Sequence, residues 1–258
     1  MATRELDLAA AKKKIVAFIS GRASDAGVDG AVLGLSGGID SAVTAYLTVE
    51  ALGSRRVTAL ILPDFRVTPE GDVSDAREVA EELCVETRVI DIAPIHRAFM
   101  KGLVQNRLAE GNLRARIRMG LLYYHANSTN RMVVGTGDRS EALLGYFTKY
   151  GDGGVDILPI GDLYKTEVRN MGEILGISRR ITAKRSSPRL WPGQTAEGEL
   201  GMSYEAIDSV LRMHVDLKKS VREVAAKLGL SVEQVRMISG RLERTEHKRR
   251  VPEVCKVH

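Results

Sequence analysis

The chain has 258 residues, of which 44% are apolar and 28% are charged, a composition typical of a folded globular protein. A chain of this length and composition buries a sizeable core, which excludes wholesale disorder. Lys and Arg number 38 against 33 Asp and Glu, giving a net charge of +5. This weak basic bias suits a phosphate-bearing ligand or a nucleic acid without choosing between them.

The two cysteines and the start of the chain exclude further classes. Cys84 and Cys255 are far apart and neither belongs to a C-x-x-C, which excludes a zinc site built on cysteine pairs and argues against a disulfide framework. The segment Met1–Lys14 is charged and lacks the apolar core of a secretory signal. No apolar run is long enough to span a membrane. We therefore expect a cytoplasmic protein with no membrane partner.

Short β-rich apolar runs alternate with helical patterns. The expected strands are Gly30–Leu35, Arg56–Leu62, Glu86–Ile92 and Arg131–Gly135. The expected helices are, roughly, Leu6–Ser20, Asp40–Leu52, Ser74–Leu83, Asn112–Asn127 and Tyr164–Leu175, with further helices from Ser203 to about Arg249. Apolar strands separated by helices predict a doubly wound α/β fold, in which helices cover both faces of a parallel sheet. We expect residues 1–258 to form one domain, with 203–258 as a helical C-terminal extension.

Two loops interrupt this pattern late in the chain. Tyr150–Asp156 is glycine-rich and acidic, and Lys184–Gly201 is rich in turn residues and holds the only tryptophan. Loops this irregular in a compact chain are often lids or binding loops. The alternative is a surface excursion without function.

A glycine-rich segment, Gly34–Ser41 (GLSGGIDS), lies where the first strand ends and a helix begins. In a doubly wound sheet this is the edge where ligands bind. The glycines Gly37–Gly38 let backbone N–H groups approach an anion, and the helix amino terminus adds its positive dipole. Ser36 and Ser41 can donate hydroxyls to the same oxygens. Asp40 would repel a phosphate unless a cation separated them, so the segment predicts a phosphate site with Mg²⁺.

Other interpretations of this segment stay open at this point. It is not a Walker A loop, because no Gly-Lys-[Ser/Thr] follows. Gly34–Gly38 does match G-x-S-x-G, the nucleophile elbow of α/β-hydrolases, with Ser36 as the nucleophile. The chain has no HGGG-type oxyanion segment, which weakens the hydrolase hypothesis. A glycine-rich turn without a ligand is the plain structural alternative.

The motif SGGIDS resembles the pyrophosphate loop of the N-type ATP pyrophosphatases, which include GMP synthetase, argininosuccinate synthetase, tRNA-thiolating enzymes and NAD synthetase. Later motifs separate these members and resemble NAD synthetases in order and spacing, from about Leu33 to Pro252. They are Asn112–Met119 (NLRARIRM), Gly135–Glu141 (GTGDRSE), Gly145–Asp156 (GYFTKYGDGGVD), Leu163–Arg169 (LYKTEVR), Leu190–Leu200 (LWPGQTAEGEL) and Glu246–Arg249 (EHKR). The chain has no room for an amino-terminal glutaminase domain, so it resembles the ammonia-dependent form, which is a homodimer.

The resemblance implies a carbon–nitrogen ligase that amidates deamido-NAD to NAD. ATP adenylates the carboxylate with release of pyrophosphate, and ammonia then displaces AMP. Such a site must stabilise two polyanions and a developing negative charge. The alternatives are another enzyme of the same group, tRNA-thiolating or GMP synthetase-like, and a hydrolase acting through Ser36.

The resemblance also implies roles for particular residues. Asp40 and Glu141 follow the first and fourth strands and would hold one Mg²⁺ between them, although Glu141 alone could simply favour a helix amino terminus. The expected ATP-binding residues are Gly34, Leu35, Ser36, Gly37, Gly38, Ile39, Asp40, Ser41, Thr136, Lys165 and Ser187. The expected deamido-NAD-binding residues are Arg116, Lys149, Asp156, His247 and Lys248. The expected catalytic residues are Asp40, Lys165 and Asp152, the last binding a second metal or taking a proton from ammonium.

Some assignments stay open. Ser187 matches the hydroxyl that contacts ATP, but a shift of one residue would give that role to Ser186. Arg114, Arg116 and Arg118 spread around one helix, so one or two of them are expected to be structural ion-pair partners. His96, His125 and His214 have no partners at ligand spacing, and we predict no zinc site.

The C-terminal region contains one competing motif. Ser220–Leu242 has two helical patterns joined at Gly229, the second opened by a Ser231–Gln234 capping box, which together resemble a helix-turn-helix. The second helix begins with Glu233, Gln234 and Arg236, a mixed rather than basic face. We therefore predict no nucleic-acid partner.

Overall fold

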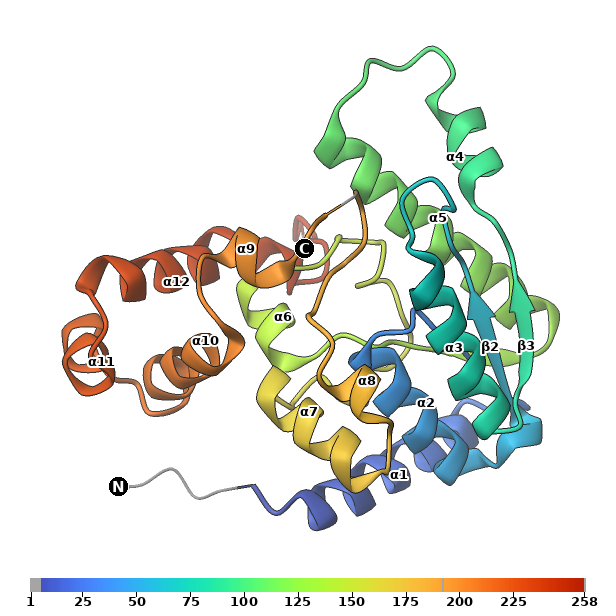
Figure 1. The fold of residues 1–258 in the computed structure, drawn as a ribbon, viewed down its shortest axis with the longest axis horizontal. Helices are drawn as coiled ribbons and strands as arrows, with labels where there is room; N and C mark the ends of the chain where they lie inside the picture. The colour runs from blue at the N-terminus through green and yellow to red at the C-terminus, as the bar shows by residue number, and fades with distance from the viewer. Residues whose placement is uncertain (1–5, 192, 258) are drawn as a thin grey trace.

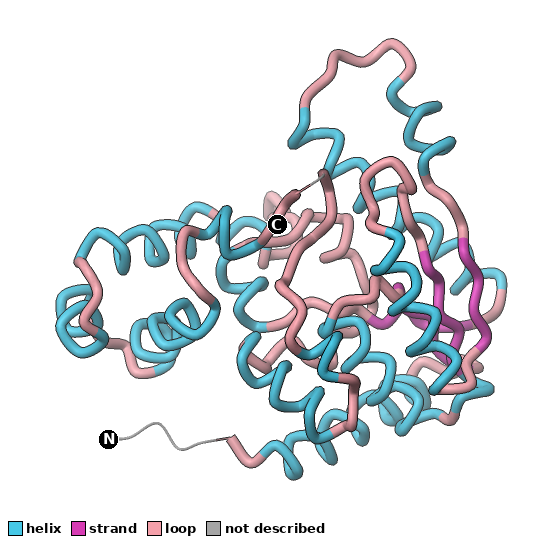
Figure 2. The backbone as a smooth tube through the Cα atoms, in the orientation of Figure 1, coloured by secondary structure: helices cyan, strands magenta, loops and turns pink. Residues whose placement is uncertain are grey.

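The computed structural model describes residues 6–191 and 193–257, and its centre is a parallel sheet of four strands in the order β3-β2-β1-β4 (Figures 1 and 2). The strands are β1 (Gly30–Gly34), β2 (Val57–Ile61), β3 (Glu86–Val89) and β4 (Arg131–Val134). Ala31 pairs with Val57 on one side and with Met132 on the other. A single parallel bridge from Val134 to Ile157 extends the sheet beyond β4.

Helices cover both faces of this sheet, as predicted for a doubly wound fold. The first face carries α1 (Leu8–Asp25), α2 (Ile39–Leu52), α3 (Glu70–Glu82) and α7 (Lys165–Ile174). The second carries α4 (Ala93–Met100) and α5 (Arg107–Ser128). The strands alternate between them, since Ala31 and Leu33 pack in the first core and Val32 in the second.

All four predicted strands and all five predicted helices of the α/β region exist, with bounds that differ by a few residues. Strand β3 ends at Val89, three residues before the predicted end at Ile92, and its side chains are mostly exposed. Strand β3 lies at the edge of the sheet, and helices cover it less than the prediction for every strand implied. It carries the Glu86–Arg88 ion pair. Several short elements were not predicted: α4, α6 (Arg139–Leu144), α8 (Arg179–Thr182), α9 (Ala196–Leu200) and the 3₁₀ turn Ser54–Arg56.

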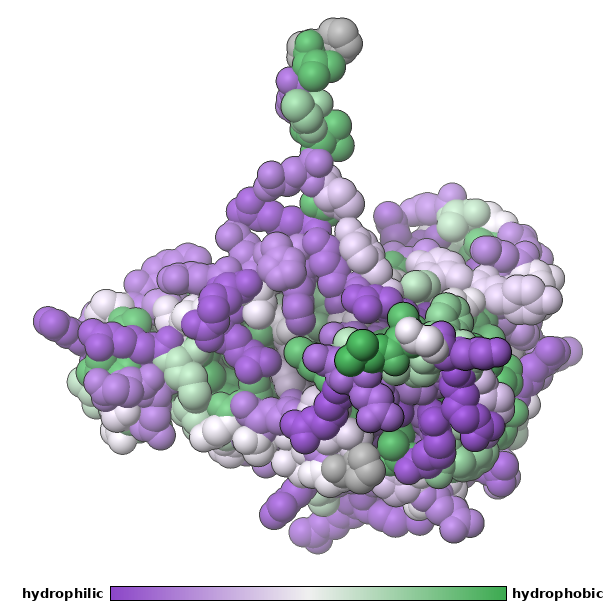
Figure 3. All heavy atoms as spheres, turned by 90° about the horizontal axis from the view of Figure 1, so that it is seen from above, coloured by the Kyte–Doolittle hydropathy of each residue, from purple (hydrophilic) through white to green (hydrophobic). Residues whose placement is uncertain are grey.

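The predicted helical extension follows α9 and lies to one side of the sheet (Figure 1). It comprises α10 (Tyr204–Leu211), a π turn (Arg212–Asp216), α11 (Val221–Leu228), α12 (Val232–Arg244) and a 3₁₀ turn (Glu246–Lys248). Ser231 and Gln234 form the predicted capping box. Ile207, Val224 and Val235 join Leu144 of α6 in a separate core, which we call the C-terminal apolar cluster. The segment after the last turn projects from the body as a stalk (Figure 3).

None of the helices within residues 6–191 and 193–257 combines the length and apolar character needed to cross a membrane.

Candidate active site

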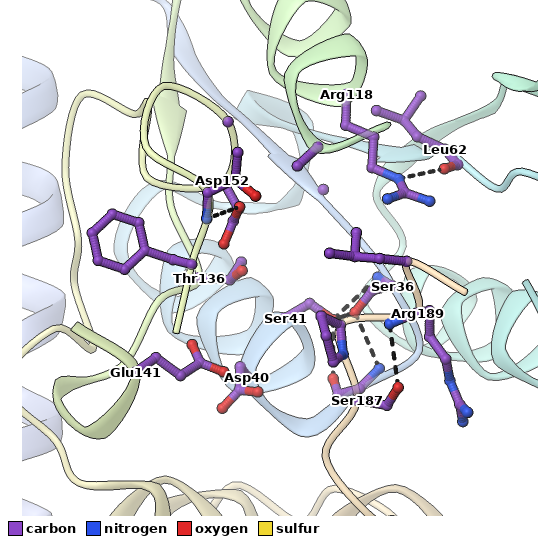
Figure 4. Close-up of a pocket in the computed structure, with 18 of the residues that line it drawn as sticks. Ser36, Asp40, Ser41, Leu62, Arg118, Thr136, Glu141, Asp152, Ser187 and Arg189 are labelled. Carbon is purple, nitrogen blue, oxygen red and sulfur yellow. Dashed lines mark hydrogen bonds between the residues drawn. The ribbon is translucent and has the colours of Figure 1, made fainter. Parts of the chain in front are cut away.

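A cavity of about 420 Å³ opens at the carboxyl edge of the sheet. The ends of β1, β2 and β4 form its base, and α5 and two loops, 145–155 and 184–194, form its walls. Most predicted site residues line it: Gly34, Leu35, Ser36, Gly38, Ile39, Asp40, Ser41, Thr136, Glu141, Asp152, Ser187 and Lys248. Figure 4 labels Ser36, Asp40, Ser41, Thr136, Glu141, Asp152 and Ser187 among them. Gly37, Arg116, Lys149, Asp156, Lys165 and His247 are not among its lining residues.

The glycine-rich segment forms a tight turn from β1 into α2. Gly37 has φ +74°, and a Cβ there would lie 2.1 Å from the backbone oxygen of Asp72, so this position requires glycine. Ser36 N donates to Ser41 Oγ at 3.2 Å, and Ser41 Oγ donates to Gly38 O at 2.9 Å. The N-cap residue of α2, Gly38, provides no side-chain cap. The turn therefore presents backbone N–H groups and a helix dipole to the cavity, as an anion site requires.

A second group, which we call the carboxylate cluster, lies beside this turn and consists of Asp40, Asp138, Glu141 and Lys165. The Lys165 ammonium is fully buried and lies 2.7 Å from Asp40 Oδ2, 2.9 Å from Asp138 Oδ2 and 3.0 Å from Glu141 Oε1. Asp138 is also fully buried and caps α6, since its Oδ1 accepts from Glu141 N at 2.8 Å. Three carboxylates thus surround one ammonium, and the cluster carries an excess of negative charge when all are ionised.

The buried setting changes the proton affinities of the cluster. Burial raises the pKa of Asp138 to about 6, although the Lys165 charge opposes the shift. Burial also raises the pKa of Glu141 well above its usual value, against the same opposing charge. Burial alone would lower the pKa of Lys165, but the three carboxylates outweigh it and raise that pKa. The carboxyl groups therefore lack enough positive charge, and a further cation would favour their ionised forms.

The donor set fits a magnesium ion that also binds a phosphate. Asp40 Oδ1 is buried and has no hydrogen-bond partner among the described residues. Carboxylate oxygens from Asp40 and Glu141 both face the cavity (Figure 4). Among the described residues, no group of three or more His, Cys, Asp or Glu side chains could hold a metal ion without other ligands. Mg²⁺ commonly takes only one or two protein carboxylates and completes its shell with substrate phosphates and water.

The loop Lys184–Gly201 is tied to the glycine-rich turn through α3. Lys184 Nζ donates to Asp72 Oδ1 at 2.9 Å and to Gly37 O at 2.8 Å. Arg189 Nε donates to the other oxygen of the same carboxylate at 2.7 Å. Asp72, which is nearly fully buried, therefore fixes the loop against the turn. Pro192 lies outside the described residues.

Ser186 and Ser187, the two candidates for the hydroxyl that contacts ATP, have different hydrogen-bond partners. Ser187 Oγ donates to Gln194 O at 2.6 Å and accepts from Arg189 N at 3.2 Å, so it holds the loop together. Ser186 Oγ is buried and has no hydrogen-bond partner within the described residues. Both serines line the cavity, and the contact of Ser187 with ATP stays a prediction.

The residues predicted to bind deamido-NAD separate into two groups. Lys248 lines the cavity and donates to Gly145 O and Phe147 O at 2.8 and 2.7 Å. Arg116, Lys149 and His247 form a chain on the outer side, because Arg116 donates to Lys149 O at 3.3 Å and Lys149 donates to His247 O at 2.8 Å. One ligand could reach both groups only by extending out of the cavity.

Asp156 and Asp152 belong to the same glycine-rich acidic loop, but their carboxylates have different partners and only Asp152 lines the cavity. Both Asp156 oxygens have structural partners, Tyr123 Oη at 2.8 Å and Val133 N at 2.7 Å. Asp152 faces the cavity, and its Oδ1 accepts from Thr148 N at 2.9 Å. The surrounding protein raises the pKa of Asp152 by desolvation, which suits a group that takes up a proton.

Sequence reasoning missed Asp138, Lys184 and Arg189 as parts of this site. The D-x-x-E spacing of Asp138 and Glu141 is a capping-box signal that could have found the first. The other two depend on a loop whose path no local pattern predicts. The expectation that some α5 arginines pair structurally is confirmed for Arg114, whose Nε donates to Asp64 Oδ2 at 2.8 Å.

The hydrolase hypothesis lacks a general base. Ser36 Oγ lies 3.0 Å from Ser41 Oγ and 3.3 Å from Gly38 N. No histidine is among the described residues that line the cavity. His96 and His125 are instead buried outside it, where burial lowers the pKa of each ring.

Together the sheet order, the anion-binding turn and the adjacent carboxylates define a nucleotide-binding α/β protein of the adenine nucleotide alpha hydrolase-like fold. The family model described as NAD synthase matches residues 11–252. An NH(3)-dependent NAD(+) synthetase of Methanosarcina acetivorans is 50% identical over 257 residues, which cover 98% of this chain and 100% of that relative. The chain belongs to the NAD synthase family.

Two solved structures agree with this membership. The NMN synthetase from Francisella tularensis is 36% identical and has a TM-score of 0.86, over 97% of this chain and 99% of that one. The NH3-dependent NAD synthetase from Campylobacter jejuni, in complex with the nitrate ion, is 31% identical with a TM-score of 0.84, over 98% and 100% of the two chains.

Proposed function

We propose that this chain is an ammonia-dependent NAD synthetase that converts deamido-NAD, ATP and ammonia to NAD, AMP and pyrophosphate. The single observation that carries this proposal is the match to the NAD synthase family over nearly the whole chain, including curated NH(3)-dependent relatives at about 50% identity. The cavity supports it, because one end offers an anion-binding turn and the other a set of cationic and acidic side chains.

In this mechanism the chain first holds ATP with its phosphates at the glycine-rich turn. Asp40 and Glu141 would hold Mg²⁺, which when bound neutralises phosphate charge and favours the departure of pyrophosphate. Thr136, Ser187 and the turn itself would contact the nucleotide. Lys165 lies within 3.0 Å of both proposed metal ligands, so its ammonium would hold these two carboxylates in position beside the phosphates.

The chemical step then joins the two substrates. The carboxylate of deamido-NAD attacks the α-phosphorus of ATP, and the bond to pyrophosphate breaks. Ammonia next attacks the acyl carbon, and the bond to AMP breaks. Asp152, whose pKa is raised by burial, would take the proton that ammonium must lose before it can attack. On the basis of the family resemblance, we propose that deamido-NAD contacts Arg116, Lys149, Asp156, His247 and Lys248.

We also propose that the enzyme is a homodimer. Tyr124 of α5 is 76% exposed, and Arg116 of the same helix is also exposed. Tyr150, beside Lys149, is a further exposed aromatic residue. Exposed aromatic side chains next to part of the proposed dinucleotide site favour a second copy of the chain as the partner of this surface. Removing residues beyond Leu242 is expected to abolish deamido-NAD binding and spare ATP binding.

Domain organisation and location remain part of the proposal. We propose that residues 1–258 act as one domain, with 203–258 as a helical subregion. A cytoplasmic location would keep the two free cysteines reduced. Neither a nucleic acid nor a membrane is proposed as a partner.

The test is an assay with purified protein, ATP, Mg²⁺, deamido-NAD and ammonium. We expect pyrophosphate, AMP and NAD in equal amounts, and none without deamido-NAD. Pyrophosphate formed only with another acceptor would keep the ATP site and contradict the dinucleotide substrate. Nicotinate mononucleotide is the acceptor to try next, because a similar solved structure is an NMN synthetase.

A further inference from the structure

Two arginines of α5 lie one helical turn apart, Arg114 buried and Arg118 partly buried, and only Arg114 has a carboxylate partner. The Arg114 guanidinium is balanced by Asp64, a carboxylate with no solvent exposure. Arg114 also donates to Leu190 O at 3.3 Å, which ties the helix to the loop over the cavity. Arg118 instead extends into the cavity itself (Figure 4). The position of Arg118 therefore has no structural explanation of the kind that accounts for Arg114.

The Arg118 side chain is anchored on one side only. Nε donates to Leu62 O, at the carboxyl end of β2, at 2.9 Å. Within the part of the chain that the structure describes, its two terminal nitrogens have no hydrogen-bond partner and no carboxylate at ion-pair distance. Figure 4 shows the guanidinium on the cavity side of Leu62 and well apart from Asp40 and Glu141. The contact with Leu62 orients the guanidinium and leaves its terminal nitrogens free.

The charge on Arg118 persists in this position. Burial lowers its pKa to about 10, which leaves the side chain protonated at neutral pH. The charged groups that influence it are Asp64 and Asp152, which favour the charge, and Arg114, which opposes it. A partly buried cation without a carboxylate partner costs free energy, and proteins retain one chiefly where a ligand supplies the missing negative charge.

We propose that Arg118 is the cation of an oxyanion subsite in this cavity. A guanidinium held at Nε offers two terminal N–H groups side by side, an arrangement that matches the paired oxygens of a phosphate or a carboxylate. This proposal rests on the proposed function, which supplies two sources of such oxygens: a phosphate of the adenine nucleotide and the carboxylate of deamido-NAD. The subsite is distinct from the carboxylate cluster, which lies across the cavity.

The experiment measures equilibrium binding by calorimetry to the wild-type protein and to Arg118→Met and Arg118→Lys. Each anion is paired with a relative that lacks one anionic group: ATP with adenosine, which lacks the phosphates, and deamido-NAD with NAD, which carries an amide in place of the carboxylate. Arg55→Met is the matched control, because Arg55 is exposed at the opposite edge of the sheet. Thermal unfolding checks that every variant is folded.

We expect Arg118→Met to weaken the binding of one anionic ligand about 10- to 100-fold and that of its paired relative by less than about twofold, with Arg118→Lys between wild type and Met. Loss confined to ATP identifies a phosphate as the ligand group, and loss confined to deamido-NAD identifies the carboxylate. Equal weakening within either pair, or no weakening of either anion, would overturn the proposal. A wild-type protein that binds ATP but not deamido-NAD would contradict the proposed function, while the ATP arm would still test Arg118.

Discussion

Two buried clusters meet at α6, and they are built from opposite chemistry. At the start of the helix, Asp138 and Glu141 belong to the carboxylate cluster, where charges are buried around one ammonium. At its end, Leu144 belongs to the C-terminal apolar cluster, where buried side chains contact other apolar side chains. Burial of apolar area stabilises a fold, whereas burial of charge costs free energy that pairing repays only in part. The comparison teaches that one end of α6 stabilises the fold, while the other end carries buried charges, among them a proposed metal ligand.

The largest expected effect comes from removing the one cation of the carboxylate cluster. Lys165→Met should destabilise the protein by about 3–5 kcal/mol, because three carboxylates lose their partner. The pKa values of Asp138 and Glu141, already raised in the folded state, would rise further. A carboxyl with a raised folded pKa contributes stability at low pH and loses it as pH rises through that pKa. The variant should therefore be least stable at alkaline pH.

Urea unfolding of the Lys165→Met variant between pH 5 and pH 8 measures this effect. Lys219→Met is the control, because Lys219 forms an exposed ion pair with Glu223 that is expected to contribute less than about 1 kcal/mol. A Lys165→Met protein as stable as wild type at pH 8 would show that the negative charge of the three carboxylates does not destabilise the fold.

Removing a cluster carboxylate should separate function from stability. We expect Asp40→Ala to lower the rate of pyrophosphate release about 100- to 1,000-fold, since Asp40 is a proposed metal ligand and adjoins the anion-binding turn. Its unfolding temperature should fall little, because the change removes one excess negative charge from the cluster. Asp25→Ala, at an exposed site on α1, is the control. An Asp40→Ala protein that keeps its activity but loses stability would show that the carboxylate cluster supports the fold rather than the reaction.

A small change in the apolar cluster should show the opposite pattern. Ile207 of α10 is fully buried, and Ile207→Val should destabilise the protein by about 0.5–1.5 kcal/mol through loss of one methylene group. The turnover of the folded protein should stay at the wild-type value. Urea unfolding and the NAD assay on the same sample measure both quantities, and a specific loss of turnover would mean that the apolar cluster also shapes the site.

The smallest expected effect concerns the pH dependence of the wild-type protein. The folded pKa of Asp138, about 6, exceeds its ordinary value, so its contribution to stability is present at acidic pH and is lost as pH rises through 6. Asp138→Asn keeps an oxygen for the α6 cap but removes this titration. The difference in unfolding temperature between variant and wild type should therefore shift in favour of the variant from pH 5 to pH 8. A constant difference across that range would contradict the raised pKa.

The sequence predicted the parts of this site that depend on local pattern. The glycine-rich turn lies at the end of β1 as expected, because strand, turn and helix follow one another along the chain. Asp40 and Glu141 meet at one edge because parallel strands end together. These inferences needed only the period of the apolar residues and the topology of a parallel sheet.

The rest depends on contacts between distant segments. Lys165 was expected at a phosphate, yet its ammonium lies among three carboxylates that come from two distant parts of the chain, the start of α2 and the start of α6. Asp156 resembles a ligand-binding residue in its motif, but both of its oxygens are used by α5 and β4. The position of Asp72 between Lys184 and Arg189 follows from the path of a long loop. Side-chain partners of this kind are decided by packing, which no sequence period encodes.

The edge strand β3 has a consequence for behaviour at high protein concentration. A sheet edge offers unpaired backbone groups to which a strand from another molecule can bind, and this is a common start of aggregation. Here the edge is only four residues long and carries the charged side chains Glu86 and Arg88. The opposite edge is partly covered by the bridge to Ile157. Both edges of the sheet are thus protected against the addition of foreign strands, one by charge and shortness and the other by the protein's own chain.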